Sequence, residues 1–496
     1  MKTFSPAVAL LLSSTSAFAD ITPQDVLQSW RGFYAGFGAT ISSDTPEVAD
    51  GITRFTNLRT DMNMINTEAH YNFSWVDMKS NADGSVDITF SPEGNASTLS
   101  KVSGGNAESQ ISYDLSALTI HSEGTPGDIR YSYNAPVITI HQSQNLPDVD
   151  ISMTIALENW QGTALSVDDG EGLVSDSAES TFDSLSAKVV FEPRRENPVY
   201  LDYIAESISV AYDVSLPRTP PPDAPQLSDF YLDGMVFGLS LNTGPATTTV
   251  DQKTSKGDGR FSFIQSSGEI TTAFAENALS YGFTAMGANL SLVNTPSQPV
   301  DFTAAFERAH LGFTMPVRKA DAPAPFALAM ALEGFTMGEE IWARFDPEAT
   351  LSHAPAGFSF SVNGTMKLFV DLMDQTAVMA IRGAPFELRS LSLSSLNLQF
   401  EGMGLTGIGD LIFDNERTDP ISGMPEPNGV LEFSIDGALG MLDKIGRLGF
   451  IEPLAIIGAK GALGMFATPN ASADSFSSRI EFTEGGHVSV NGQQVK

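Results

Sequence analysis

The sequence of 496 residues contains no cysteine. Disulfide bonds, thiolate nucleophiles, cysteine-ligated zinc and iron–sulfur clusters are therefore excluded. A bacterial lipoprotein anchor requires a cysteine at its cleavage site, so it is excluded for the same reason. Any chemistry or anchoring must use other residue types.

Basic residues are also scarce. Lys and Arg total 27 against 60 Asp and Glu, which gives a formal net charge of −33. Nucleic acids bind proteins mainly through Lys and Arg contacts to phosphate, and anionic lipid surfaces attract polybasic segments. We therefore expect no nucleic-acid partner, and the charge as a whole disfavours adsorption to anionic lipid.

No apolar run has the length of a transmembrane helix. At the N-terminus, Lys2 precedes the short apolar core Val8–Leu12, which is followed by the small-x-small site Ala17-Phe18-Ala19. This pattern is typical of a secretory signal peptide, and its core is far shorter than the ~20 residues that span a bilayer. We predict cleavage between Ala19 and Asp20, which leaves an exported chain without a transmembrane anchor. The predicted location is periplasmic or, alternatively, secreted.

The predicted mature chain opens with a helix. Thr22 is a candidate N-cap, Pro23 stands where its missing N–H costs nothing, and Asp25 suits the helix N-terminus. Apolar residues then recur at helical spacing at Val26, Trp30, Phe33 and Phe37. Gly36 and Gly38 predict the end of the helix. We interpret the apolar stripe as core packing rather than as a ligand site.

Most of the remaining chain alternates apolar and polar residues with a period of two. Clear examples are Val86–Phe90, Ile151–Leu157 and Ile208–Val214. Such alternation is typical of antiparallel sheets with one buried and one solvated face. Hairpin dipeptides such as Asp233-Gly234 and Asn363-Gly364 recur. The predicted fold is mainly β: extended, curved antiparallel sheet with a few packed helices.

A proline-rich stretch over residues 216–227 marks the predicted boundary between two β-rich halves, because proline removes sheet hydrogen-bond donors. The predicted organisation is a signal peptide at 1–19, an N-terminal half at 20–216, a linker at 217–226 and a C-terminal half at 227–496. Two helices are predicted near the end, over Ala438–Leu448 and Pro453–Phe466. Their apolar side chains, Ile457 among them, are expected to face the sheet.

Several segments resemble a bacterial protein family. They are Ile341–Leu368, Leu405–Asn415, Gly440–Gly449 and Arg479–Lys496. On these segments and the opening helix, the chain resembles the family known as domain of unknown function 2125, over most of the predicted mature chain. The resemblance implies an exported envelope protein and carries over no catalytic residue. A looser similarity, in the repeated strands and the terminal Val490-Asn491-Gly492 hairpin, is to AsmA-like envelope proteins linked with lipid and outer-membrane homeostasis.

Motifs for cofactor or metal chemistry are weak. Residues 402–407 match G-x-G-x-x-G, but a dinucleotide site needs a following helix, whereas residues 409–413 have the pattern of a strand. A bend or bulge explains these glycines better. The histidines are His70, His121, His141, His310, His353 and His487, and no two have the spacing of a helical zinc pair. We predict no cofactor and no metal site.

Acidic residues form several close pairs. Glu339-Glu340 and the pair Asp148 and Asp150 are examples, and two facing carboxylates can serve a glycosidase. With 60 acidic residues, however, such pairs arise by chance. Residues 168–172 (DDGEG) offer oxygen ligands for Ca²⁺ but lack the EF-hand loop pattern, so a solvated acidic loop is the preferred interpretation.

Three cations stand beside apolar residues of the predicted C-terminal helices. They are Lys444, Arg447 and Lys460. We interpret them as charges of an ordinary surface helix that cap its C-terminus or pair with acids. The alternative is that their side chains extend toward lipid headgroups.

Three functions are compatible with these observations. The first is a non-catalytic binding or carrier protein for a lipid or other hydrophobic ligand, for which a continuous apolar surface is expected. The second is an envelope scaffold or assembly factor that contacts other envelope proteins through sheet edges. The third and least favoured is a hydrolase with paired carboxylates, one of which has a perturbed pKa.

Overall fold

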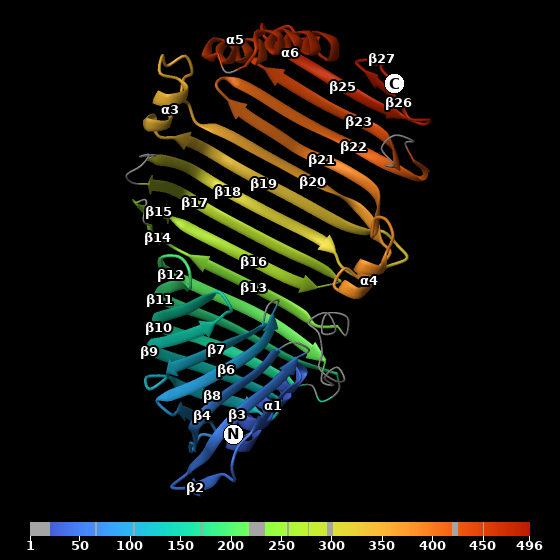
Figure 1. Cartoon of the computed structure of the whole chain (residues 1–496). Coiled ribbons are helices and arrows are strands. Elements are labelled where there is room, and N and C mark those ends of the chain that lie inside the picture. The colour runs from blue at the N-terminus through green and yellow to red at the C-terminus, as the bar shows by residue number, and fades with distance from the viewer. Residues whose placement is uncertain are drawn as a thin grey trace, which may run out of the picture.

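The computed structural model describes residues 20–64, 67–102, 105–168, 170, 172–217, 234–254, 257–275, 277–294, 301–418, 425–449 and 451–496. Within these ranges the chain is mainly β, as predicted: its strands join one antiparallel sheet, and five helices accompany it. Figure 1 shows the first strands curling around helix α1 and the later strands continuing as a broad sheet toward the C-terminus.

Helix α1 (Pro23–Gly36) has the N-terminus that the sequence predicts. Thr22 accepts a hydrogen bond from the backbone N–H of Asp25 at 3.3 Å, and the Asp25 carboxylate accepts one from the Thr22 backbone N–H at 2.8 Å. This reciprocal pair is a capping box. The helix ends before Phe37 and Gly38, and Gly38 has a φ of 74° that glycine adopts without strain.

Twelve strands make up the described N-terminal part of the sheet. They are β1 (Ala39–Ser42), β2 (Glu47–Ala49), β3 (Ile52–Met64), β4 (Thr67–Ser80), β5 (Val86–Phe90), β6 (Glu93–Val102), β7 (Gly105–Asp114), β8 (Thr119–Thr125), β9 (Asp128–Asn145), β10 (Val149–Asp168), β11 (Leu173–Pro193) and β12 (Val199–Pro217). Strands β9 to β12 pair in sequence order.

The sheet continues across the predicted boundary between the halves, because β12 pairs with both β13 and β14. The later strands are β13 (Val236–Thr243), β14 (Ala246–Thr254), β15 (Gly257–Gln265), β16 (Ser267–Ala275), β17 (Ala278–Asn294), β18 (Phe302–Pro316), β19 (Ala324–Met337), β20 (Ala356–Leu368), β21 (Phe386–Phe400), β22 (Met403–Thr418), β23 (Pro425–Asp436), β24 (Thr468–Pro469), β25 (Ser475–Thr483), β26 (His487–Val490) and β27 (Gln493–Gln494). Most of the predicted linker lies outside the described residues.

The same strand arrangement occurs twice. Between the long strands β4 and β9, the short strands pair as β5 with β8 and β6 with β7, and both pairs bridge the two long strands. Between β12 and β17, the short strands pair as β13 with β16 and β14 with β15 in the same nested order. The repeat is one of topology, and the sequence shows no matching repeat.

Several long strands contain a left-handed residue near their middle. Such residues are Asn57, Asn159, Ser207, Gly287 and Gly334, with φ between 51° and 65°. A left-handed residue interrupts the two-residue repeat of a strand. Two apolar residues on either side of it can therefore share one face although their residue numbers differ by an odd number. Leu157 and Trp160, on either side of Asn159, pack in the same cluster. The apolar face therefore continues although the sequence pattern changes phase.

The other helices lie at the ends of strands. They are α3 (Glu339–Phe345), α4 (Gln375–Ala380), α5 (Ala438–Leu448) and α6 (Pro453–Phe466). The bounds of α5 and α6 match the predicted ranges. The predicted orientation of α6 is wrong, because Ile457 is exposed and no residue of α6 is buried. Figure 1 shows α5 and α6 beyond β23 and β25, at the end of the molecule far from α1.

Candidate functional site

One face of the sheet is apolar across its C-terminal part. Residues directly opposite each other on neighbouring antiparallel strands lie on the same face, so the register traces rows across the sheet. One row crosses ten pairs of neighbouring strands from β13 to β26: Leu239, Thr272, Tyr281, Phe313, Leu328, Val362, Leu393, Gly409, Leu431, Ile480 and Val490. A second row runs beside it: Leu241, Ile270, Phe283, Leu311, Met330, Phe360 and Leu396. We call this surface the apolar face.

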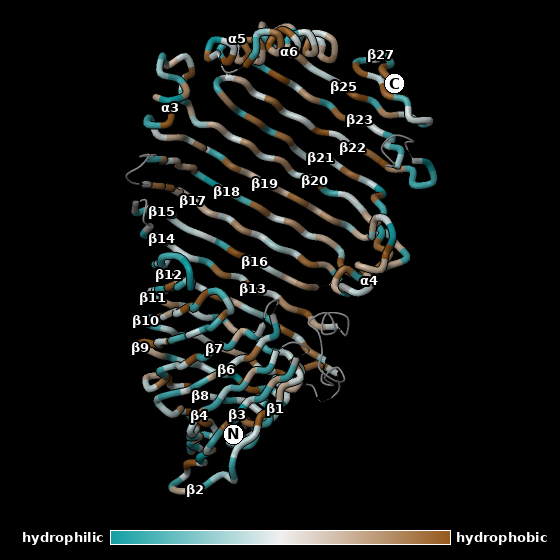
Figure 2. The backbone as a smooth tube through the Cα atoms, viewed as in Figure 1, coloured by the Kyte–Doolittle hydropathy of each residue, from teal (hydrophilic) through white to brown (hydrophobic). Residues whose placement is uncertain are grey.

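The opposite surface, here called the polar face, has a different composition. The residues that neighbour the first row along the same strands form it: Gly238, Ala273, Ser280, Thr314, Ala327, Asn363, Ser392, Asp410, Val430, Glu481 and Ser489. Small and hydroxyl-bearing side chains dominate it. Figure 2 shows hydrophobic and hydrophilic positions alternating along these strands.

In the described part of the chain, no second layer lies over the C-terminal part of the apolar face. The four clusters of buried apolar residues lie between Ile21 and Ala246. Beyond β16, Leu311, Leu328 and Met330 of the apolar face are exposed. Within the described residues, α3 and α5 touch the sheet only at strand ends. A face with this many large apolar side chains is normally buried.

Helix α1 covers the N-terminal end of the same face. Tyr212 of β12 lies directly opposite Leu239, so it belongs to the first row. Tyr212 packs in a cluster with Phe33 and Phe37 of α1. Val26 and other α1 residues fill a second cluster with β3, β4, β5 and β9. The apolar face is therefore a closed core beneath α1 and an open surface beyond it.

A largely buried carboxyl group lies at the covered end. Asp176 of β11 accepts a hydrogen bond from the Tyr212 hydroxyl at 2.9 Å. Burial raises the pKa of Asp176 to about 6, although the Tyr212 hydrogen bond acts in the opposite direction. Nearby, Ser29 of α1 donates to Ser166 at 3.0 Å, which places hydroxyl groups between the helix and the sheet.

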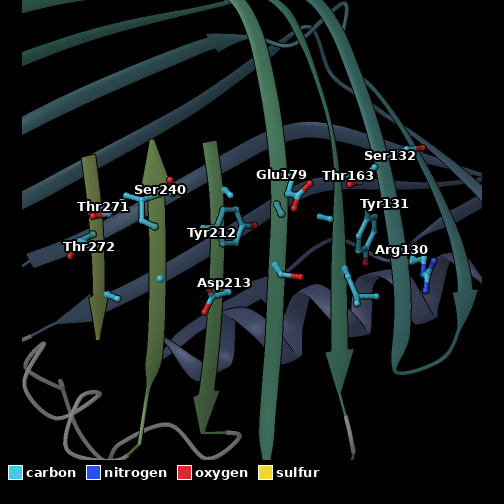
Figure 3. A pocket seen from close by; sticks show the side chains of 18 of the residues that line it. Arg130, Tyr131, Ser132, Thr163, Glu179, Tyr212, Asp213, Ser240, Thr271 and Thr272 are labelled. Atoms are coloured by element: carbon cyan, nitrogen blue, oxygen red, sulfur yellow. The ribbon is translucent and has the colours of Figure 1, made fainter. Parts of the chain in front are cut away.

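The polar face is hollowed over the N-terminal strands. Two adjoining pockets of about 880 and 640 Å³ lie there. Figure 3 shows the larger pocket, with Arg130, Glu179, Asp213 and Ser240 among its lining residues and α1 behind the strands. Asp176 lines neither pocket. Its donor Tyr212 packs with Phe33 and Phe37 of α1, whereas the hollow is viewed with α1 behind the strands (Figure 3). Within the described residues, no three side chains are grouped as metal ligands.

A polar cluster joins α3, α5 and the turn between β21 and β22. The Glu401 side chain is fully buried, and one of its oxygens accepts from the Ser352 backbone N–H at 2.6 Å. Lys444 of α5 lies 3.6 Å from the same oxygen. His353 stacks on Trp342, with ring centroids 4.2 Å apart, and its Nε2 is 3.4 Å from Asp346.

The histidines identified in the sequence are mostly apart. His70 pairs with Asp61 at 2.6 Å, and His121 pairs with Asp87 at 2.7 Å. His353 is the one that joins a larger cluster. Glu339, one of the paired acids, reaches His353 at 3.4 Å, whereas Glu340 instead accepts from the Thr303 backbone N–H at 2.9 Å.

The glycine motif adopts the structure expected for it. Gly402 has a φ of 84° in the turn after β21, and residues 403–409 lie within strand β22. Of the predicted cleavage site, Ala17 and Ala19 lie outside the described residues, and Asp20 is the first described residue. Asp169 and Glu171 of the acidic loop also lie outside them.

Of the three cations of the C-terminal helices, two pair with acids, as the interpretation of an ordinary surface helix predicts. Lys460 lies 2.5 Å from Asp443, and Lys444 pairs with Glu401. Arg447 is exposed and donates to the Asp443 backbone oxygen at 3.4 Å.

Asp176 is not among the residues that the sequence motifs identify. A signal was present, since Val174, Asp176 and Ala178 occupy alternate positions of one strand and Asp176 is the acidic member. The signal is weak because Ser180 follows in the same phase, so the strand does not look apolar on that face.

No helix in the described part of the chain is long and apolar enough to cross a membrane. A scan against protein-family models and a search of curated proteins found no match to this chain.

Proposed function

We propose that the protein is an exported, non-catalytic carrier for a lipid or a similarly hydrophobic molecule. The observation that supports it is the apolar face, which runs from β13 to β26 without a covering layer in the described residues. Exposed apolar area costs about 25 cal/mol per Å² relative to burial. A ligand with apolar chains would remove that area from water.

The dimensions of the apolar face suit an elongated ligand. Ten steps between neighbouring strands, at about 4.8 Å each, give a length of about 50 Å. This length is comparable with the ~40–45 Å thickness of a whole bilayer. Lipid chains need no directional partners, which agrees with a surface made of Leu, Phe, Met and Ile.

The scaffold alternative receives less support. Sheet edges recruit protein partners when they are long and flat. The outermost strands are short instead: β2 covers Glu47–Ala49 and β27 covers Gln493–Gln494. A partner protein would therefore have to use the apolar face itself.

Among the described residues, no assembled site supports the hydrolase alternative. The hollow of the polar face contains Glu179 and Asp213, whereas the carboxyl group whose pKa is raised, Asp176, lies on the other face beneath α1. A catalytic pair requires both carboxylates around one cleft.

The proposal also includes export to the periplasm, which the N-terminal pattern supports. It includes membership of the family known as domain of unknown function 2125, which the segments quoted above support.

The test places charge on one face or the other of a single strand. Leu328→Glu with Met330→Glu changes the apolar face of β19, and Ala327→Glu with Ala329→Glu changes the polar face of the same strand. The ligand is a zwitterionic phospholipid with an environment-sensitive fluorophore on one acyl chain. We expect the apolar-face variant to bind at least tenfold more weakly, because buried charge is strongly disfavoured. The polar-face variant should bind within twofold of the unchanged protein. Equal binding by both variants would contradict the proposal.

A further inference from the structure

Helix α6 is apolar around its whole circumference and yet exposed. Its sequence, PLAIIGAKGALGMF, contains one charged residue, Lys460. Leu454, Ile457 and Met465 are 78%, 65% and 72% exposed, and no residue of the helix is buried. A helix that is apolar on every side is normally buried in protein or lipid.

The protein covers only a narrow stripe of α6. Ile456, Lys460 and Leu463, at positions i, i+4 and i+7, are the residues with intermediate exposure. Lys460 reaches back to Asp443 of α5 at 2.5 Å, so the one charge of α6 is neutralised on the side of its neighbour helix. The rest of the surface offers apolar side chains and glycines.

The length of α6 excludes a membrane-spanning role and suits a surface one. Fourteen residues at about 1.5 Å each give about 21 Å, whereas the hydrocarbon core is about 30 Å thick. A helix too short to span the core can still bury apolar side chains at the boundary between the headgroups and the acyl chains.

The charge around α6 is close to balanced, although the whole chain has a net charge of −33. Lys444 and Lys460 are paired with acids, Glu401 and Asp443. Arg447 is exposed, and so is Glu452, which directly precedes α6. Arg447 is exposed beside the apolar helix, where its side chain can reach phosphate headgroups. At physiological ionic strength charges beyond about 8 Å are largely screened, so the acids elsewhere act weakly on a surface that α6 touches.

We propose that α6, with Arg447 beside it, docks the protein onto the surface of a phospholipid bilayer. The helix lies at the C-terminal end of the apolar face, so docking brings that end of the face to the membrane. The docking function does not depend on cargo binding, because α6 forms no part of the two apolar rows.

Vesicle flotation tests the docking function. Vesicles contain phosphatidylcholine and phosphatidylglycerol at four to one in 0.15 M NaCl, and the protein is the purified chain in its exported form. The test variant combines Leu454→Ser, Ile457→Ser and Met465→Ser. The matched control combines Val48→Ser, Ile408→Ser and Ile412→Ser, whose side chains are 71%, 54% and 68% exposed elsewhere on the protein. Because all six positions are exposed, both variants should fold.

We expect the unchanged protein and the control to float with the vesicles, and the α6 variant to lose at least about thirtyfold in partition coefficient. Circular dichroism and phospholipid binding on the apolar face should be the same for all three proteins. Failure of the unchanged protein to float, or equal flotation of the α6 variant, would overturn the proposal. So would a dimer in sedimentation velocity that the α6 variant abolishes while no protein floats, because α6 would then bind a second copy of this chain.

Discussion

At the residue scale, Asp176 is expected to lower the stability of the folded protein. Its carboxyl group is largely buried between α1 and the sheet, and the Tyr212 hydroxyl is its hydrogen-bond donor. The pKa of about 6 exceeds the ordinary value of 3.8. Between these values the folded state holds more protons than the unfolded state, so this group lowers stability as the pH rises through that window.

The variant Asp176→Asn should therefore be more stable than the unchanged protein at pH 8. A shift of about two pKa units corresponds to at most about 3 kcal/mol, and we expect a gain of about 2 kcal/mol because an amide oxygen still accepts from Tyr212. The gain should become small near pH 4, because the carboxyl group is then protonated in the folded state and partly protonated in the unfolded state. Urea unfolding at pH 4 and pH 8 measures both values. A gain that is the same at the two pH values would show that ionisation of Asp176 is not its cause.

A second residue-scale prediction concerns the buried Glu401. Its carboxylate has Lys444 at 3.6 Å, and one of its oxygens is buried without a hydrogen-bond partner. Lys444→Met leaves this carboxylate buried without its cation, with the Ser352 backbone N–H as its hydrogen-bond donor, which should destabilise the protein by about 3 kcal/mol. The double variant with Glu401→Gln should recover most of that loss. A double-mutant cycle from urea unfolding gives the coupling, and additive losses would contradict a Glu401–Lys444 interaction.

At the element scale, local signals predicted the helices and the strand type well. The bounds of α5 and α6 and the cap of α1 depend on proline, glycine and capping residues within one turn, all visible in the sequence. The orientation of α6 was not predictable in this way, because its apolar residues surround the helix and mark no single face. Short helices such as α4 also went unpredicted, since six residues give little periodicity.

The left-handed residues show another limit of local patterns. At Asn159 and Ser207 the apolar residues of the strand change from even to odd positions or the reverse, so no single alternation describes the whole strand. Only the cross-strand register shows that the two phases share one face. For the same reason the apolar face could be hypothesised from the sequence, but its continuity over ten strand pairs could not be derived.

At the scale of the whole molecule, the net negative charge should affect the stability of the folded state. With a net charge of −33, self-repulsion should oppose the folded state at low ionic strength. Raising NaCl from about 10 mM to 0.5 M shortens the screening length from about 30 Å to a few ångströms, and we expect the melting temperature to rise by several degrees. Thermal melts with sorbitol at matched osmolality control for solvent exclusion. A flat or falling melting temperature would contradict this prediction.

The central claim is that the apolar face carries a hydrophobic ligand. The most direct measurement is native mass spectrometry, with lipid extraction, of the protein purified from its own compartment without detergent. We expect a reproducible lipid bound at near one per chain, which is lost in the variant that places charges on the apolar face of β19 and kept in its polar-face control. A clean ligand-free mass, under conditions that keep lipid on a known carrier, would contradict the claim.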